Sequence, residues 1–273
     1  MRALIAVLAA GVLAACSRVI PAKPPMWRVT GGRATAWLLG SMHVLPDHVD
    51  WQDGVVARAI ADADTLVLES NPEATSDFNA IAKTTGMQPL ARRLSSDQRE
   101  ALRRAIARAG LSENALDGYK DWSAAVMLGA GDAAHAGASP QRGVDAQLWQ
   151  SFARHRRATL ALEPVGAQLR VLDALPPALQ HLMLEEAVSG APYDSVLRAW
   201  SNGDVAALDR STGAQNLRAF LVVSPNRRWS AWIARRMAHP GTLLIALGAG
   251  HFVGTESIVA MLASRGFNVA RVQ

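Results

Sequence analysis

Cysteine is almost absent from this chain, in which Cys16 is the only one among 273 residues. No disulfide can form within the chain, so stability must come from the apolar core. Cys16 directly follows the apolar run Ala3–Ala15. The segment Leu13-Ala14-Ala15-Cys16 is typical of the lipobox at which bacterial lipoproteins are cleaved and lipidated. With Cys16 acylated, no thiol remains for a cysteine nucleophile or a thiolate metal site. Any metal ion must then be held by histidine nitrogen and carboxylate oxygen.

The N-terminal leader predicts export. Its basic start and apolar run are typical of a signal peptide, and the run is too short to span a bilayer. We predict a signal peptide at residues 1–15, a lipidated Cys16 with a proline-rich tether at residues 16–26, and one folded domain at residues 27–273. An ordinary secretory cleavage site with an incidental cysteine is the alternative. Ser17 favours anchoring in the outer membrane. We therefore predict a lipid-anchored protein of the bacterial cell envelope that faces the periplasm.

Charged residues are also scarce. They make up 19% of the chain against 50% apolar residues, which is typical of a globular domain and argues against disorder. The 28 basic residues exceed the 23 acidic ones, but the arginines are spread along predicted helices between apolar positions. Because this spacing is typical of solvated helix faces, we predict no nucleic-acid partner. The membrane contact that we expect is made through the lipid anchor.

Short apolar runs near both ends of the chain predict strands, whereas the middle predicts helices. At the N-terminal end, Trp37–Leu39 and Thr65–Glu69 flank a helical stretch in the order of a βαβ unit. At the C-terminal end, Leu243–Leu247 is followed by a helix and a last strand. Residues from about 76 to 238 are mostly helical, interrupted by a strand at Ala158–Glu163. We predict a mixed α/β (α+β) fold with a central sheet formed from N- and C-terminal βαβ-like segments and a large helical insertion.

Two matching motifs follow strands at opposite ends of the chain. Gly40-Ser41-Met42-His43 and Gly248-Ala249-Gly250-His251 each begin with a glycine, which lets the backbone turn sharply as the strand ends. Each motif then places a histidine at the carboxyl end of a strand, where open α/β sheets bind ligands. Two further predicted strands end in Glu69 and Glu163. These four side chains can share one site if their strands are neighbours.

Two histidines and a glutamate are the protein ligands of many hydrolytic metal sites. We predict that His43, His251 and Glu69 hold a divalent ion, and that Glu163 or Asp145 orients a ligand or acts as the general base. A histidine alone is more often structural, so the prediction depends on the matched pair. The chain has no His-Glu-x-x-His zinc helix and no Gly-x-Ser-x-Gly elbow. The glycine spacing of the second motif also misses the dinucleotide fingerprint.

Three segments in combination resemble the TraB/GumN group of the wider Tiki-like superfamily, which is related to erythromycin esterases and to ChaN-type haem-binding lipoproteins. The segments are Leu38–Pro46, Leu66–Glu69 and Ala246–Gly254, and the similarity extends over residues 27–273. Gly143-Val144-Asp145 is similar to the middle of the family. The resemblance implies a mixed α/β core with a helical insertion.

The resemblance also implies a metal-dependent hydrolase, with peptidase activity in some eukaryotic relatives. It carries over His43, Glu69 and His251 as ligands of a divalent ion of the Mn, Co or Zn class. Relatives often have an Arg-Asn pair before the penultimate helix, whereas here Asn226 follows a proline. Arg227 and the arginine after it are candidates to replace the missing guanidinium, so Asn226 and Arg227 are also candidate catalytic residues.

We therefore predict a lipid-anchored envelope protein that hydrolyses a peptide or a small amide or ester. Two alternatives stay open. One is a non-catalytic lipoprotein that binds a peptide, or haem through its strand-end histidines. The other is a structural envelope protein with a degenerate site.

Overall fold

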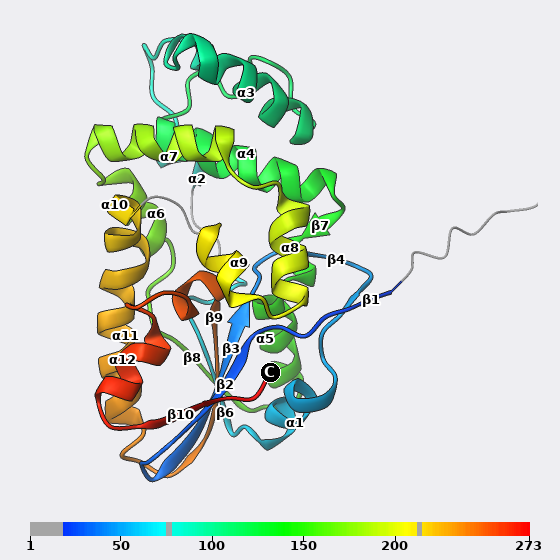
Figure 1. Cartoon of the computed structure of the whole chain (residues 1–273), viewed down its shortest axis with the longest axis vertical. Coiled ribbons are helices and arrows are strands. Elements are labelled where there is room, and N and C mark those ends of the chain that lie inside the picture. Colours follow the sequence, from blue (N-terminus) through cyan, green and yellow to red (C-terminus); the bar gives the residue numbers. More distant parts are fainter. Residues whose placement is uncertain (1–18, 75–77, 212–214) are drawn as a thin grey trace, which may run out of the picture.

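The computed structural model describes residues 19–74, 78–211 and 215–273. The predicted signal peptide and Cys16 lie outside the described residues. The described chain forms a central sheet with helices on both faces, and further helices lie beyond one end of the strands (Figure 1). This arrangement confirms the mixed α/β fold with a helical insertion. In the described part of the chain, no helix is both long and apolar enough to cross a membrane.

The central sheet has six strands. They are β2 (Met26–Thr30), β3 (Ala34–Ser41), β6 (Thr65–Leu68), β8 (Ala158–Ala161), β9 (Gly241–Gly248) and β10 (Asn268–Arg271). Their order is β10-β2-β3-β9-β6-β8. β9 lies between β3 and β6 and pairs with both in parallel, so the carboxyl ends of these three strands lie side by side. β3 and β9 are apolar runs that are buried over most of their length, as expected for strands covered on both faces.

The terminal segments differ from simple parallel βαβ units. β3 and β6 are separated by β9, which comes from the other end of the chain. The last strand, β10, does not lie beside β9 but pairs antiparallel with β2. β2 in turn pairs antiparallel with β3, so it joins β10 to the sheet. The sequence did not predict β2, because Arg28 interrupts its short apolar run.

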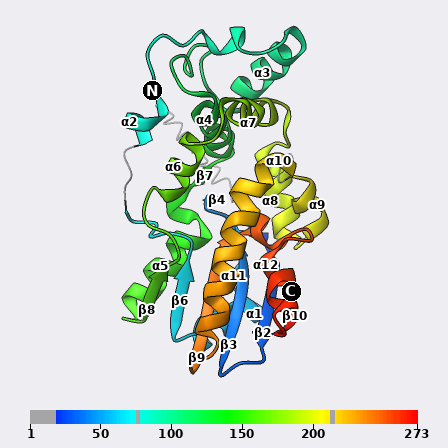
Figure 2. The same cartoon turned by 90° about the vertical axis from the view of Figure 1, so that its left-hand side faces the viewer.

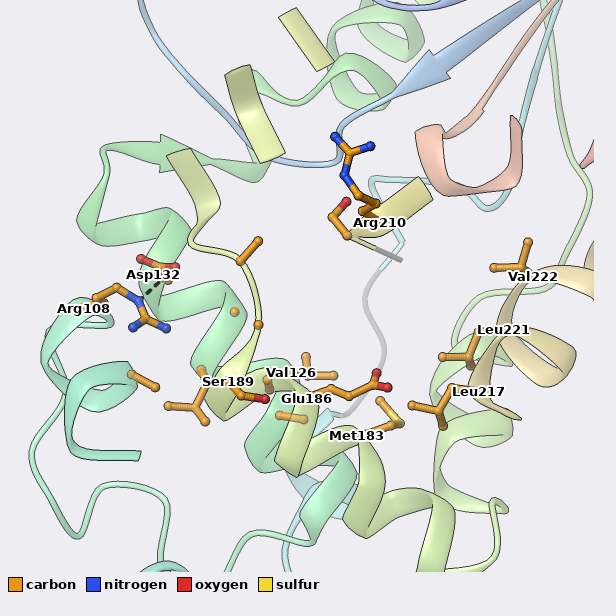
Figure 3. A pocket seen from close by; sticks show the side chains of 18 residues that line it. Arg108, Val126, Asp132, Met183, Glu186, Ser189, Arg210, Leu217, Leu221 and Val222 are labelled. Atoms are coloured by element: carbon orange, nitrogen blue, oxygen red, sulfur yellow. Dashed lines mark ion pairs between the residues drawn. The ribbon is translucent and has the colours of Figure 1, made fainter. Parts of the chain in front are cut away.

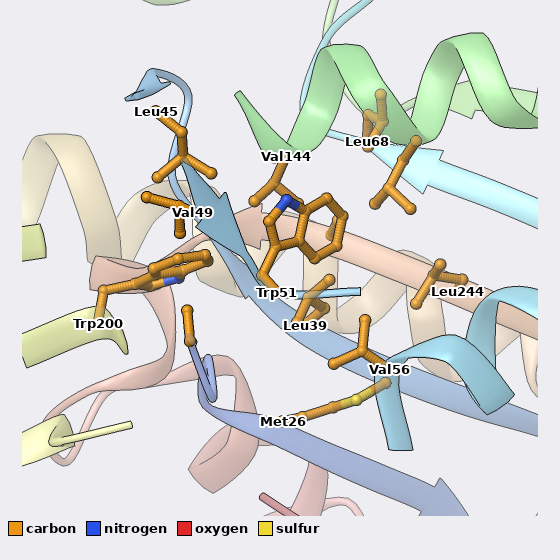
Figure 4. Close-up of a cluster of buried hydrophobic side chains, with 14 of the residues drawn as sticks. Met26, Leu39, Leu45, Val49, Trp51, Val56, Leu68, Val144, Trp200 and Leu244 are labelled. Carbon is orange, nitrogen blue, oxygen red and sulfur yellow. The ribbon is translucent and has the colours of Figure 1, made fainter. Parts of the chain in front are cut away.

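Helices cover both faces of the sheet. On one face lie α1 (Gly54–Asp62) and α5 (Val144–Arg154), and on the other lie α11 (Ser224–Arg236) and α12 (Ile258–Ser264). Neighbouring strand residues point to opposite faces. Leu39 and Leu244 therefore join Trp51 in the first core (Figure 4), whereas Leu38 and Ile245 join the second.

The remaining helices form the helical part, above the sheet in Figure 1 and Figure 2. It contains α2 (Phe78–Ala82), α3 (Ser96–Arg108), α4 (Asp121–His135), α6 (Ala167–Asp173), α7 (Pro177–Ser189), α8 (Tyr193–Ser201), α9 (Val205–Arg210) and α10 (Gln215–Arg218). The shorter elements are the strands β1 (Ile20–Pro21), β4 (Leu45–Pro46), β5 (Val49–Asp50) and β7 (Ala138–Ser139), the 3-10 helices η1 (Leu90–Arg92), η2 (Pro140–Arg142) and η4 (Ala249–Phe252), and the π-helix η3 (Ala219–Val223).

α3 illustrates how local sequence sets the ends of a helix. The side chain of Ser95 accepts a hydrogen bond from the Gln98 N–H, and the Gln98 side chain accepts one from the Ser95 N–H. This is the capping box that a serine followed by a glutamine three positions later favours. Leu102 and Ile106 are buried in the core of the helical part. Gly110 has a φ of 63° directly after the helix, a conformation that favours glycine.

Residues 20–26, which the sequence assigned to a tether, instead belong to the folded domain. β1 pairs in parallel with β5, and the N–H of Lys23 donates to the carbonyl of Ser201 at 2.7 Å. Met26 is fully buried at the start of β2. The prolines of this segment do not keep it away from the domain, because Pro25 is itself buried against the fold.

Candidate functional site

Three predicted ligands meet at the carboxyl edge of the sheet. His43 follows β3, Glu69 follows β6 and His251 lies in η4 directly after β9. A Cβ atom placed on Gly248 would lie 3.2 Å from Glu69 Oε1, 3.5 Å from His43 Nε2 and 3.7 Å from His251 Cδ2. The three side chains therefore surround a space that exists because position 248 is a glycine.

His251 is held in one orientation by Asn226. Its Nδ1 lies 2.8 Å from Asn226 Oδ1. The Asn226 amide nitrogen donates to the carbonyls of His251 and Glu256, which directs the amide oxygen toward the ring. Nδ1 is therefore the protonated nitrogen, and Nε2 faces Glu69 Oε1 at 3.6 Å. Burial lowers the pKa of His251, which favours the neutral ring that binds metals.

His43 is held by Asp145 in a similar way. Its Nδ1 lies 2.8 Å from Asp145 Oδ2, and Ser41 Oγ donates to the other oxygen of the same carboxylate at 3.2 Å. The Asp145 charge raises the pKa of His43 to about 10. Solvent weakens this effect, because the His43 side chain is 57% exposed. The Nδ1 proton is thus engaged by Asp145, while Nε2 faces the site.

Asp145 reaches His43 because α5 begins against the backbone of the first motif. The N–H of Val144 donates to the carbonyl of Met42 at 2.9 Å. A Cβ atom on Gly143 would lie only 2.0 Å from the carbonyl oxygen of His43. Only a glycine permits this approach of two backbone segments.

Asn226 enters the site just after the π-helix. The N–H of Ser224 bonds to the carbonyl of Ala219, five residues earlier. Pro225 follows, and in a regular α-helix its ring would clash with the carbonyl four residues earlier. The wider π turn accommodates that proline. Asn226 is then fully buried in the first turn of α11, beside His251.

The structure does not bring Arg227 to this group. Its side chain is 71% exposed and lies 3.3 Å from Glu256. Arg228 is in the site instead, with its guanidinium 2.6 Å from Glu163 Oε1. Glu163 follows β8, and its N–H donates to the carbonyl of Glu69 at 2.8 Å, which places the two glutamates on adjacent strand ends.

Several cavities open from this group. One of about 420 Å³ is lined by His43, Glu69 and His251 together. A second of about 560 Å³ extends past Asp145, and a third of about 240 Å³ extends toward η3 and α11. A pocket of about 540 Å³ in the helical part, shown in Figure 3, shares Val222 with the first cavity. The group lies where these openings meet, as a substrate-binding cleft requires.

Comparison with known protein families matches residues 25–271 to the TraB/PrgY/gumN family. The chain belongs to the TraB/PrgY/gumN family. The match includes both Gly-x-x-His motifs and all the side chains described above.

Two similar relatives are both called uncharacterized protein YbaP. The Shigella flexneri protein is 25% identical over 240 residues, which cover 85% of this chain and 89% of the relative. The protein from Escherichia coli (strain K12) is 25% identical over 234 residues, which cover 82% and 86% of the two chains. No solved structure shows a significant match.

In this TraB/PrgY/gumN protein the three predicted ligands lie close to one another, but they are not arranged as a metal coordination shell. Within residues 19–74, 78–211 and 215–273, no group of three or more His, Cys, Asp or Glu side chains is arranged to hold a metal ion. His251 Nε2 and Glu69 Oε1 are 3.6 Å apart, within the roughly 4.4 Å that two ligands bonded at up to about 2.2 Å can span. His43 is the exposed member, and its Nε2 lies beside the same space at Gly248. The donor set therefore fits a divalent ion if His43 closes on the other two.

The glycines that begin the two motifs provide space rather than a turn. The expectation of a sharp turn at each glycine is wrong, because Gly248 has a φ of −49° and Gly40 lies within β3. A Cβ atom on Gly40 would lie 3.0 Å from Pro25 Cγ. The sequence offered Arg228 only as an alternative to Arg227, and the only signal at Gly143 was the family-like Gly-Val-Asp segment.

Proposed function

We propose that this protein is a metal-dependent hydrolase of amide or ester bonds in the bacterial cell envelope, with a peptide as substrate and Cys16 as lipid anchor. The observation that carries the proposal is the way in which the two histidines are held. Nδ1 of His43 and Nδ1 of His251 each contact an oxygen, from Asp145 and Asn226 respectively, which leaves both Nε2 atoms for an ion. Metal-binding histidines are commonly oriented by such partners.

The charges around His251 favour a bound cation. With the proton on Nδ1, Nε2 carries a lone pair and faces a carboxylate oxygen of Glu69 at 3.6 Å. The two side chains are only 9% and 11% exposed. Two electron-rich atoms repel one another in such a buried site unless positive charge lies between them. A divalent ion supplies that charge, and the absence of a side chain at Gly248 leaves room for it.

The chemistry that we propose divides between the ion and the chain. A bound divalent ion supplies Lewis-acid polarisation of the scissile carbonyl. Asp145 and Asn226 keep the histidines oriented. Arg228 holds Glu163 Oε1 at 2.6 Å, which leaves the second Glu163 oxygen to accept a proton from the attacking water. The Arg228 guanidinium is then positioned to stabilise negative charge that develops on the substrate oxygen.

The direct test is metal analysis of the full chain, purified without added ions or chelators. We expect about one divalent ion per chain, and we expect His43→Ala combined with His251→Ala to remove it. His155→Ala combined with His239→Ala is the matched control, since both of these histidines are exposed and outside the site. Stoichiometric metal in the first double variant would refute the site assignment.

Gly248→Ala is expected to block the site with a single carbon atom. The new methyl group would lie 3.2 Å from Glu69 Oε1 and 3.5 Å from His43 Nε2, in the space that we assign to the ion. The backbone at Gly248 is acceptable for alanine, so the melting temperature should change little while metal content falls. Gly129→Ala is the control, because among the described residues no atom would lie within 4 Å of its Cβ atom. Full metal occupancy in Gly248→Ala would place the ion elsewhere.

A further inference from the structure

We propose that the cavity of about 240 Å³ beside the π-helix is a specificity pocket for one uncharged apolar group, adjacent to the bond that is cleaved. We call it the η3 pocket. Its apolar wall is formed by Val171, Phe220, Leu221, Pro225 and Trp229. The inference rests on the proposed function and adds a substrate class to it, namely peptides or amides with an apolar side chain at that position.

Exposed apolar side chains gather at this pocket. In the described part of the chain the large apolar residues that are exposed are Val19, Leu160, Val171, Phe220 and Val272. Val171 from α6 is 40% exposed and Phe220 from η3 is 43% exposed, and both line the η3 pocket. Single exposed apolar residues are ordinary, whereas two that line the same cavity favour a binding site.

The wall of the pocket and the candidate metal site share one structural element. Phe220 and Leu221 belong to the π-helix, and the same irregular turn leads into Asn226, which holds His251. Irregular turns of this kind occur frequently at functional sites. The inner end of the pocket is lined by Glu69 and His251. A group bound in the η3 pocket therefore lies next to the atoms that we assign to the reaction.

The size and charge of the pocket indicate what it binds. Its volume of about 240 Å³ is below the roughly 300–1,000 Å³ of sites that enclose a whole small molecule. It therefore suits one side chain of a larger substrate. The charged residues Arg228 and Glu163 in its wall are paired at 2.6 Å, so they do not select for a charge. An uncharged leucine-like or phenylalanine-like group satisfies both conditions.

The test uses the full chain and two pairs of probes. The first pair is N-acetyl-L-phenylalanine hydroxamate and N-acetylglycine hydroxamate, whose hydroxamate groups chelate divalent ions. The second pair is the corresponding carboxamides, which do not chelate. With binding measured by saturation-transfer NMR, we expect the phenylalanine probe to bind about tenfold more tightly than the glycine probe in both pairs, because it buries an aromatic side chain.

Variants assign that preference to the pocket. Val171→Trp fills the η3 pocket from an exposed position, so the fold should be unaffected, and we expect the preference for phenylalanine to fall to about twofold or less. Leu160→Trp is the control, since Leu160 is 41% exposed outside the pocket, and it should keep the preference. Equal binding of phenylalanine and glycine probes, or a preference that Val171→Trp leaves intact, overturns the proposal. Hydroxamates that bind no better than carboxamides refute the proposed function instead, while a phenylalanine preference among the carboxamides still supports the pocket.

Discussion

Replacing Glu69 by glutamine is expected to abolish metal retention and hydrolysis while the protein stays folded. Glutamine has the same size and keeps an oxygen that can accept the 2.6 Å hydrogen bond from the Gly248 N–H. It removes the negative charge that faces His251 Nε2 at 3.6 Å. Residues that only orient a metal ligand contribute about 10–100-fold to affinity. For a ligand itself we therefore expect a loss of more than about 100-fold.

The loss is measured by competition for a divalent ion with a chromogenic chelator. Glu256→Gln is the matched control, because the Glu256 side chain is 51% exposed and forms an ion pair with Arg227. Its bond from Asn226 is made by the backbone carbonyl, which the substitution leaves in place. We expect this control to bind metal like the unmodified protein, and both variants to keep its melting temperature within a few degrees. Unchanged metal affinity in Glu69→Gln would remove Glu69 from the site.

Gly143→Ala is expected to be strongly destabilising, although alanine is normally a mild replacement. The φ of −58° at Gly143 suits any residue, so the effect is steric. The new Cβ atom would lie 2.0 Å from the carbonyl oxygen of His43 and 3.1 Å from that of Pro140. One backbone segment must move, which breaks the bond from Val144 to Met42 and separates Asp145 from the first motif.

Overpacking in a rigid region typically costs about 1–3 kcal/mol, and a contact this short places the variant at or above the upper end. We expect unfolding at a temperature roughly 6–12 °C lower, measured by circular dichroism. Gly129→Ala is again the control, because in the described part of the chain its Cβ would meet no atom within 4 Å in the middle of α4. Removing a helix glycine should leave stability unchanged or raise it by up to about 1 kcal/mol. Equal melting temperatures for the two variants would contradict the proposed contact.

Local sequence patterns predicted much of the fold. Ser95 and Gln98 set the start of α3, and the apolar runs before His43 and His251 became β3 and β9. These features depend on residues within a few positions of one another, so composition and spacing are enough to predict them. β2 was missed because one charged residue, Arg28, interrupts its short apolar run.

Contacts between distant segments escaped prediction. Nothing local indicated that Asp145, rather than Glu163, would hold His43, or that Arg228, rather than Arg227, would lie in the site. Each of these outcomes depends on which strand or helix end faces the cleft. The position of Asn226 depends in addition on the π turn before Pro225, which arises from a clash that only the helical path reveals.

The sequence by itself determined that two histidines and two glutamates follow strands, and that no thiol outside Cys16 is available to any site. These are properties of single positions and short spacings. Only the tertiary structure decided that β9 inserts between β3 and β6 and that His43, Glu69 and His251 surround Gly248. It also decided that the glycines that begin the two motifs leave room for neighbouring atoms. The physical reason is that strand order and backbone approach are set by packing across the whole sheet, where each segment's position depends on all the others.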